Sequence, residues 1–137
     1  MPVTNFMRQS GVENESGPSM HPSLVQGCYY ASAGLWPLVS IDTFQMVTGP
    51  KTDLWLVRTV GLLITIIGLI LLLAWWRRTM ALEIAVLATG SAAALAAIDV
   101  YYVARRLLSP IYLADALAET ALIAWWVFLL TRRRDRG

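Results

Sequence analysis

The sequence has little charge, and this scarcity excludes several classes of protein. Charged residues make up 15% of the 137 residues, whereas 57% are hydrophobic. A soluble domain of this length carries more charge and shorter apolar runs. The net charge of +2 is too small to indicate a nucleic-acid partner. We therefore expect a membrane protein whose main partner is the lipid bilayer, with no nucleic-acid binding.

Cysteine and histidine each occur once, as Cys28 and His21. One thiol allows no internal disulfide and no thiol pair, which excludes a quinone reductase of the vitamin K epoxide reductase type. A histidine-rich metal or haem site would need ligands from another chain. The sequence also contains no recognisable nucleophile, phosphate-binding or cofactor motif. We expect no cofactor and no metal, and the sequence favours a protein that is not an enzyme.

Long apolar runs dominate what the sequence does contain. The strongest, Leu54–Arg78, has one charge, Arg58, before it closes with two tryptophans and two arginines. A helix of this length is about 37 Å long, which exceeds the roughly 30 Å of a bilayer core. Two further spans are predicted at about Met80–Val103 and Ile111–Thr131, and a weaker first span at Leu24–Val39. The predicted fold is an all-α membrane bundle of four transmembrane helices.

The segments outside the spans complete the predicted organisation. Residues 1–20 are polar and have no hydrophobic periodicity, which is typical of a disordered tail. Ser40–Asp53 predicts a short interfacial helix between spans one and two, because apolar residues recur on one side before a Gly-Pro pair ends it. We expect a disordered cytoplasmic tail over residues 1–20, a four-helix membrane domain over 21–131 and a basic cytoplasmic tail over 132–137.

The run WPLVSIDTFQMVTGPKTDLWLVRTVG, Trp36–Gly61, resembles a segment of small four-helix bacterial membrane proteins of unknown function. The resemblance covers about a fifth of the chain. It supports the four-helix architecture and implies no reaction. The expected location is the inner membrane of a bacterium.

The arginines predict how the spans are oriented. Arg77 and Arg78 follow span two and four more arginines follow span four, so four spans place both groups on one side of the membrane. The positive-inside rule makes that side cytoplasmic. Both termini are then cytoplasmic, and Lys51, Arg105 and Arg106 lie outside as a minority.

Small residues recur at spacings of three and four, so spans one, two and three each carry a small-residue face. On spans one and two these residues are Gly27, Ala31, Gly34, Gly61, Thr65 and Gly68. On span three an alanine stripe runs from Ala81 to Ala96, and Asp99 continues it. Arg58 shares the face of span two. Because small residues let helix backbones approach closely, we expect the bundle to pack along these faces.

Ionisable residues within the outer third of the predicted spans form the candidate site. The candidate ligand-binding residues are Arg58, Asp99, Tyr102, Asp115 and Glu119. Asp115 and Glu119 lie one helical turn apart and therefore share a face. A charge costs at least ~2.5–3.5 kcal/mol near the middle of a membrane helix, so these groups need a partner or water.

Two interpretations of this site remain open. In the first, Arg58 pairs with Asp99 or Glu119 and fixes the register of the helices, while Asp115 lies exposed at the interface. In the second, Asp99 and Glu119 line a pocket that opens to the outer leaflet, together with tyrosines. These tyrosines are Tyr101, Tyr102 and Tyr112. Since three carboxylates face one arginine, a surplus carboxylate is able to bind a cation or shuttle a proton.

The sequence leaves three functions open. The favoured one is a non-enzymatic bundle that binds a hydrophobic, lipid-like molecule or acts as an accessory subunit of a homo-oligomer or larger membrane complex. The second is an intramembrane carboxylate enzyme of isomerase type, comparable in architecture alone with the sterol isomerases of the emopamil-binding family. The third is a proton- or cation-coupled transporter, which needs an oligomer to form a path.

Overall fold

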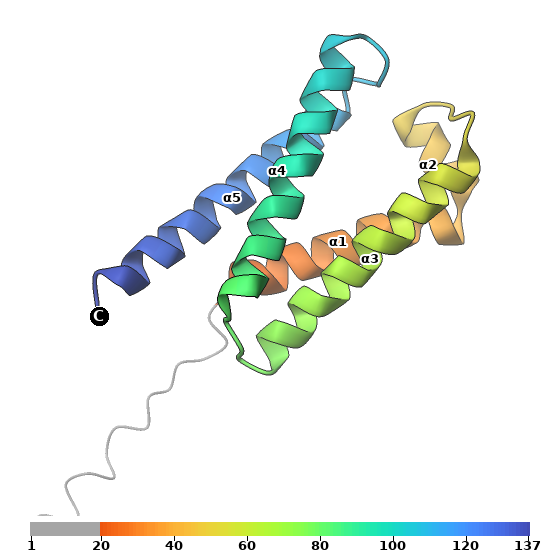
Figure 1. Ribbon diagram of the computed structural model, residues 1–137. Coiled ribbons are helices and arrows are strands. Elements are labelled where there is room, and N and C mark those ends of the chain that lie inside the picture. The colour runs from red at the N-terminus through yellow and green to blue at the C-terminus, as the bar shows by residue number, and fades with distance from the viewer. Residues whose placement is uncertain (1–19) are drawn as a thin grey trace, which may run out of the picture.

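The computed structural model describes residues 20–137, so nearly all of the tail predicted for residues 1–20 lies outside the described residues. The described part folds into five α-helices and contains no strand, which confirms the all-α class (Figure 1). The helices are α1 (Pro22–Val39), α2 (Ile41–Thr48), α3 (Leu54–Trp76), α4 (Leu82–Ala104) and α5 (Tyr112–Arg134).

Three of the helices, α3, α4 and α5, are long and apolar enough to cross a membrane. Each has 23 residues, which gives a length of about 34 Å against a bilayer core of about 30 Å. Helix α1 has 18 residues and is not in this group, because polar residues interrupt its apolar sequence. Its place as a fourth span remains a prediction.

Two predicted segments, the basic tail after α5 and the short helix before α3, can be compared with the structure. Helix α5 continues to Arg134, so half of the predicted basic tail, residues 132–134, belongs to the last turn of a helix. Positive side chains are favourable there because the C-terminal end of a helix carries partial negative charge. A short helix, α2, does lie between the first two long helices, and its location at a membrane interface remains a prediction.

Helices α1 and α3 pack together through the predicted small-residue faces. A Cβ atom added to Gly68 would lie 2.6 Å from the backbone nitrogen of Ala31, and one added to Gly61 would lie 2.7 Å from the carbonyl oxygen of Gly34. A Cβ on Gly34 would collide with the carbonyl of Gly61. The two backbones are therefore in contact along this face, as the spacing of the glycines predicts.

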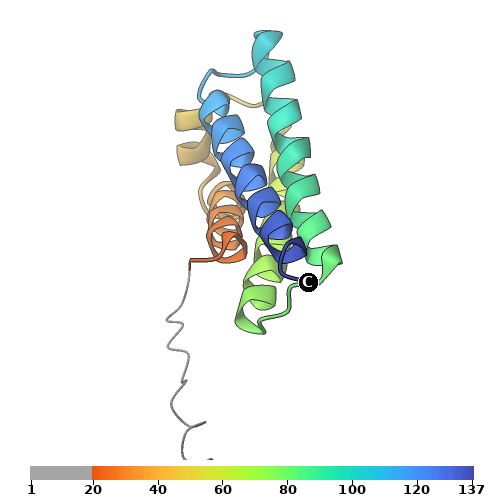
Figure 2. The same ribbon diagram turned by 90° about the vertical axis from the view of Figure 1, so that its left-hand side faces the viewer.

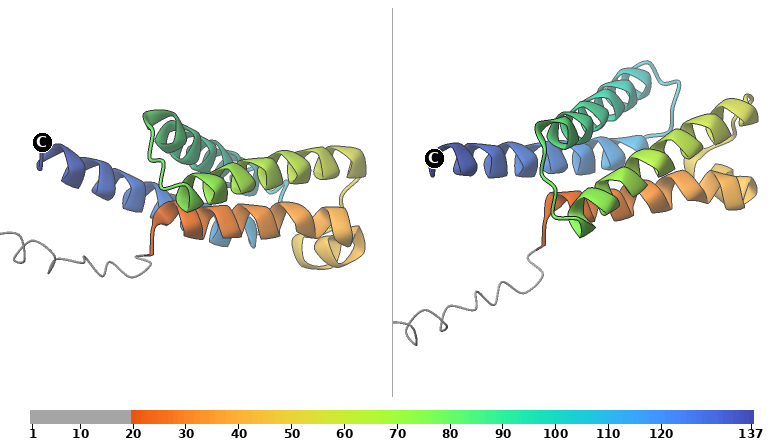
Figure 3. Two further views of the ribbon diagram at one scale, coloured as in Figure 1. Left: turned by 90° about the horizontal axis from the view of Figure 1, so that it is seen from below. Right: turned by 60° about the horizontal axis from the view of Figure 1, so that its bottom comes forward.

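Helices α4 and α5 form a second pair, and the contact between the two pairs is limited by comparison (Figures 1 and 3). The alanine stripe of α4 is buried at Ala85, Ala88 and Ala92. A small apolar core, in which Leu71 of α3 and Trp126 of α5 contact two of these alanines, joins the pairs. The bundle is thus two tight pairs with a smaller contact between them.

The four long helices alternate in direction, so the connections gather at two ends (Figure 2). One end contains the start of α1, the turn between α3 and α4, and the end of α5; we call it the arginine end. The other contains α2 and the turn between α4 and α5. At that end Lys51 Nζ lies 5.0 Å from the centre of the Tyr112 ring, which ties the loop before α3 to the start of α5.

Candidate functional site

Helix α1 carries polar side chains that bond to each of the other long helices. The Ser23 hydroxyl donates to the carbonyl of Leu71 in α3 at 2.7 Å. The Gln26 amide nitrogen donates to the carbonyl of Ala88 in α4 at 2.9 Å, and the Trp126 indole of α5 donates to the Gln26 amide oxygen at 2.8 Å. Spacings of three and four along α1 place these polar groups on one buried face.

Two tyrosines further along α1 bond to carboxylates of α5. The Tyr30 hydroxyl donates to Glu119 Oε2 at 2.7 Å, and Glu119 is only 1% exposed. The neighbouring Tyr29 hydroxyl donates to the carboxylate of Asp115, one helical turn before Glu119. Both carboxylates therefore receive a hydrogen bond from a tyrosine of α1.

A third carboxylate, Asp99 of α4, completes the group. Asp99 is 5% exposed, and its Oδ2 atom is buried without a hydrogen-bond partner. It lies near enough to Glu119 for the two charges to interact, as does Asp115. We call Asp99, Asp115 and Glu119 the acid cluster. The turn between α4 and α5 brings them together, since Asp99 precedes it and the other two follow it.

Two of the five predicted site residues make no hydrogen bond to the acid cluster among the described residues. Arg58 is exposed on α3. Tyr102 is 41% exposed and packs edge-on against Tyr101, with ring centres 5.1 Å apart. The three predicted carboxylates do lie together, whereas their role in binding a ligand remains a prediction.

The ion pair between Arg58 and an acid, one of the two interpretations of the site, does not form among the described residues. Among the described residues Arg58 bonds to neither Asp99 nor Glu119, because Tyr30 bonds Glu119 instead and Asp99 Oδ2 has no partner. The physical reason is the packing of α3. The face that Arg58 shares with Gly61 is the face that packs on α1, and the acids belong to α4 and α5.

The tyrosines of the site come from α1 rather than from α4. Tyr29 and Tyr30 are not among the predicted site residues. The sequence does contain a pattern that points to Tyr30. Ser23, Gln26 and Tyr30 recur at helical spacing within an otherwise apolar segment. Polar groups on one face of a membrane helix point to the interior of a bundle.

The acid cluster brings three carboxyl groups together without a basic partner among the described residues. Glu119 and Asp115 each accept a tyrosine hydrogen bond, which stabilises a carboxylate without cancelling its charge. Within residues 20–137, no three His, Cys, Asp or Glu side chains are arranged so that they could hold a metal ion.

Comparisons with protein families, with characterised proteins and with solved structures find no match. The function has to be inferred from the side chains themselves.

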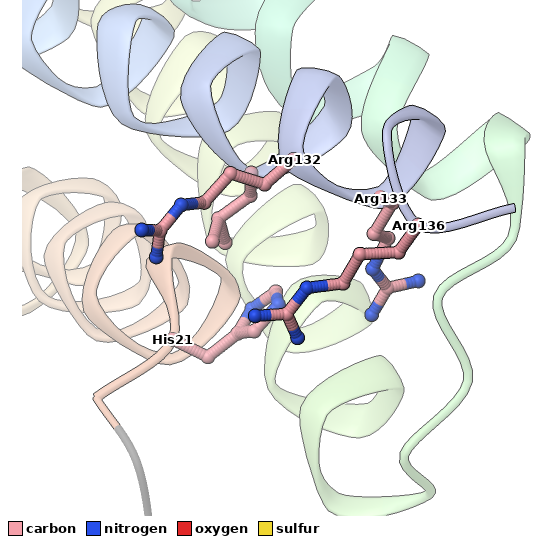
Figure 4. Close-up of a pocket in the computed structure, with 5 residues that line it drawn as sticks. His21, Arg132, Arg133 and Arg136 are labelled. Carbon is pink, nitrogen blue, oxygen red and sulfur yellow. The ribbon is translucent and has the colours of Figure 1, made fainter.

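Two hollows lie at the arginine end, and neither is lined by the acid cluster. The larger, of about 240 Å³, is lined by His21, Leu129, Arg132, Arg133 and Arg136 (Figure 4). The smaller, of about 20 Å³, shares three of these residues and extends to Met80, Ala81 and Trp126. The described structure thus separates a carboxylate group at one end from an arginine-lined hollow at the other.

His21 links this hollow to the start of α1. Its Nδ1 atom accepts a hydrogen bond from the backbone nitrogen of Ser23 at 3.2 Å, which caps the helix. Its ring packs edge-on against Trp126 at 5.5 Å. Burial lowers the pKa of His21 from its ordinary value of 6.5, and the charge of Arg133 lowers this pKa further.

Proposed function

We propose that the chain crosses the membrane four times, with α1 as the additional span. The polar side chains of α1 support this, because Ser23 and Gln26 bond to groups of α3, α4 and α5 rather than to water. A helix with polar groups survives in a bilayer when its neighbours satisfy them. An 18-residue helix is about 27 Å long, close to the thickness that has to be crossed.

We place the arginine end in the cytoplasm of a bacterium, with the protein in the inner membrane and both termini inside. The positive-inside rule supports this orientation, because Arg77 and Arg78 and the arginines after Thr131 belong to the same end (Figure 2). The acid cluster then lies toward the extracytoplasmic surface.

We further propose that the acid cluster binds and releases a proton within the membrane, and that the protein is a non-enzymatic subunit carrying this group. The observation that carries the proposal is Glu119, which is 1% exposed and bonded by Tyr30 with no basic partner among the described residues. An ionised carboxylate in hydrocarbon costs at least ~2.5–3.5 kcal/mol, and a proton removes that charge. Tyr30 is placed to relay it, since a phenol is both donor and acceptor.

Proton movement across the membrane needs more than one copy of this bundle or a partner protein. A bundle of four helices encloses little room for a water path, and the acid cluster lies nearer to one surface than to the other. The apolar faces of α3 and α5 supply surfaces on which another membrane helix can pack. A homo-oligomer or a larger membrane complex is therefore part of the proposal.

The experiment is a proton-flux assay on the full chain reconstituted in liposomes that contain a pH-sensitive dye. We expect flux in response to an imposed pH gradient, and its loss in Glu119→Gln. The matched control is Glu83→Gln, because Glu83 is an exposed carboxylate in the first turn of α4 at the arginine end. Equal flux in wild type and Glu119→Gln would contradict the proposal, as would loss of flux in the Glu83 control.

A second candidate is an accessory subunit that holds a hydrophobic molecule or a partner helix between the two helix pairs. The limited contact between the α1/α3 pair and the α4/α5 pair favours it. Purification in mild detergent followed by native mass spectrometry tests it. A bound lipid-like molecule or a co-purifying partner is expected, and a bare monomer would count against this candidate.

A further inference from the structure

The larger hollow at the arginine end is lined mainly by positively charged side chains. Three arginines and His21 line it, together with Leu129, and none of the described residues that line it is acidic. Figure 4 shows Arg132 extending from α5, and Arg136 from the residues just after it, toward the first turn of α1, where His21 lies. The volume of about 240 Å³ is several times the roughly 30 Å³ that a water molecule occupies in the liquid.

Gathering these groups has an electrostatic cost that an anion would remove. Arg132 lies in the last turn of α5 and Arg136 lies two residues beyond its end, and like charges held close together repel each other. The first turn of α1 adds the partial positive charge of a helix N-terminus. Burial lowers the pKa of His21, and the charge of Arg133 lowers it further. The negative end of the α5 dipole offsets part of this charge.

The hollow lies where the apolar part of the helices ends. Leu129 lines it on the α5 side, and the Arg132 guanidinium lies 4.9 Å from the centre of the Phe128 ring. The smaller hollow beside it, of about 20 Å³, has room for about one water and none for an acyl chain. An occupant therefore presents a compact anionic group to the hollow and keeps its apolar part outside, along α5.

We propose that this hollow, which we name the arginine site (His21, Arg132, Arg133 and Arg136), binds the phosphate group of an acidic phospholipid from the leaflet at the arginine end. Guanidinium groups bind phosphate through paired, charge-assisted hydrogen bonds. His21 adds a donor, because its Nδ1 atom accepts from Ser23 and its neutral form therefore carries the proton on Nε2. This proposal does not depend on the acid cluster.

The test measures lipid binding to the purified full chain in detergent by native mass spectrometry. Phosphatidylglycerol, phosphatidylcholine and inorganic phosphate are the probes. We expect wild type to bind phosphatidylglycerol in preference to phosphatidylcholine, because only the former carries net charge. In Arg132→Gln/Arg133→Gln/Arg136→Gln the affinity should fall by about fivefold per arginine.

Two control variants separate a built site from general positive charge. Arg134→Gln removes an arginine of the same turn that does not line the hollow. Arg105→Gln/Arg106→Gln removes two exposed arginines at the opposite end. Both should bind phosphatidylglycerol like wild type, and the single Arg136→Gln variant should already bind it more weakly.

Three results would overturn the proposal. The first is equal binding of phosphatidylglycerol and phosphatidylcholine by wild type. The second is a loss in Arg134→Gln as large as that in Arg136→Gln, because diffuse charge would then account for binding. The third is displacement of phosphatidylglycerol by an equal concentration of inorganic phosphate, which would make the ligand a free anion rather than a lipid headgroup.

Discussion

At the scale of single residues, the hydrogen bond between Tyr30 and Glu119 is the contact on which the acid cluster depends. Both side chains are about 1% exposed, and the donor–acceptor distance is 2.7 Å. A buried carboxyl that loses its partner has no water to replace it, so the cost of breaking this contact is larger than for an exposed bond.

We predict that Tyr30→Phe lowers the free energy of unfolding by about 1–3 kcal/mol, the range for a buried polar group left without its partner. The measurement is denaturant unfolding of the purified protein in micelles. Tyr101→Phe is the control, because Tyr101 is 54% exposed, and it should change stability by less than about 0.5 kcal/mol. Equal effects of the two substitutions would contradict the prediction.

The lowered pKa of His21 predicts how the stability of the fold depends on pH. Burial and then Arg133 lower its pKa below 6.5 in the folded chain. The unfolded chain therefore binds more protons below pH 6.5, so stability is complete above that value and is lost as the pH falls through the folded pKa. Unfolding measured from about pH 7.5 to about pH 5 should show this loss.

The variant His21→Gln is the reference for that titration, because other groups also titrate in this range. The pH-dependent loss of stability should be smaller in His21→Gln than in wild type. Parallel curves for the two proteins would show that His21 does not contribute.

At the scale of helices, α1 determines how the bundle is assembled. Its glycines contact the backbone of α3, and its polar side chains bond to α4 and α5. The helix with the weakest apolar signal is thus the one with contacts to all the others. Its low hydropathy follows from this position, because polar groups satisfied inside a bundle need not be excluded from it.

We predict opposite effects for two glycine-to-alanine substitutions. Gly34→Ala should lower the free energy of unfolding by roughly 1–3 kcal/mol, because the new Cβ collides with the carbonyl of Gly61. Gly90→Ala should leave stability unchanged or raise it by up to about 1 kcal/mol, because a Cβ there meets nothing within 4 Å. Denaturant unfolding in micelles measures both, and a stable Gly34→Ala protein would contradict the close contact.

Helix periodicity predicted much of this arrangement, but it did not predict which helix packs on each face. The small faces of α1 and α3, the alanine stripe and the shared face of Asp115 and Glu119 all follow from residue spacing. The pairing of Arg58 with an acid does not follow, because spacing identifies a face and not the helix that covers it. Tyr30 was missed for the same reason, since its partner Glu119 is 89 residues away.

At the scale of the whole molecule, the two ends differ in charge. The acid cluster lies toward one end, and the arginine site lies at the other with the arginines of the α3–α4 turn. Exposed apolar side chains cover the outer surfaces of α3, α4 and α5, which suits contact with acyl chains. Whether α1 crosses the membrane decides whether residues 20 and 137 lie on the same side.

We predict that residues 20 and 137 lie on the same side of the membrane. Cys28 is first replaced by serine, and Met20→Cys or Gly137→Cys is then labelled with a membrane-impermeant thiol reagent in oriented vesicles. Ser109→Cys, in the turn between α4 and α5, serves as the control for the opposite side. Four spans give equal labelling of positions 20 and 137, whereas opposite labelling would show that α1 does not cross.

Infrared difference spectroscopy of the full chain in lipid bilayers can show whether a buried carboxyl of this protein exchanges a proton. A pH step should change the carbonyl band of a protonated carboxylic acid in wild type and in Glu83→Gln. The same band change should be absent in Glu119→Gln. A wild-type spectrum without that band change, or one that Glu119→Gln leaves intact, would contradict the account.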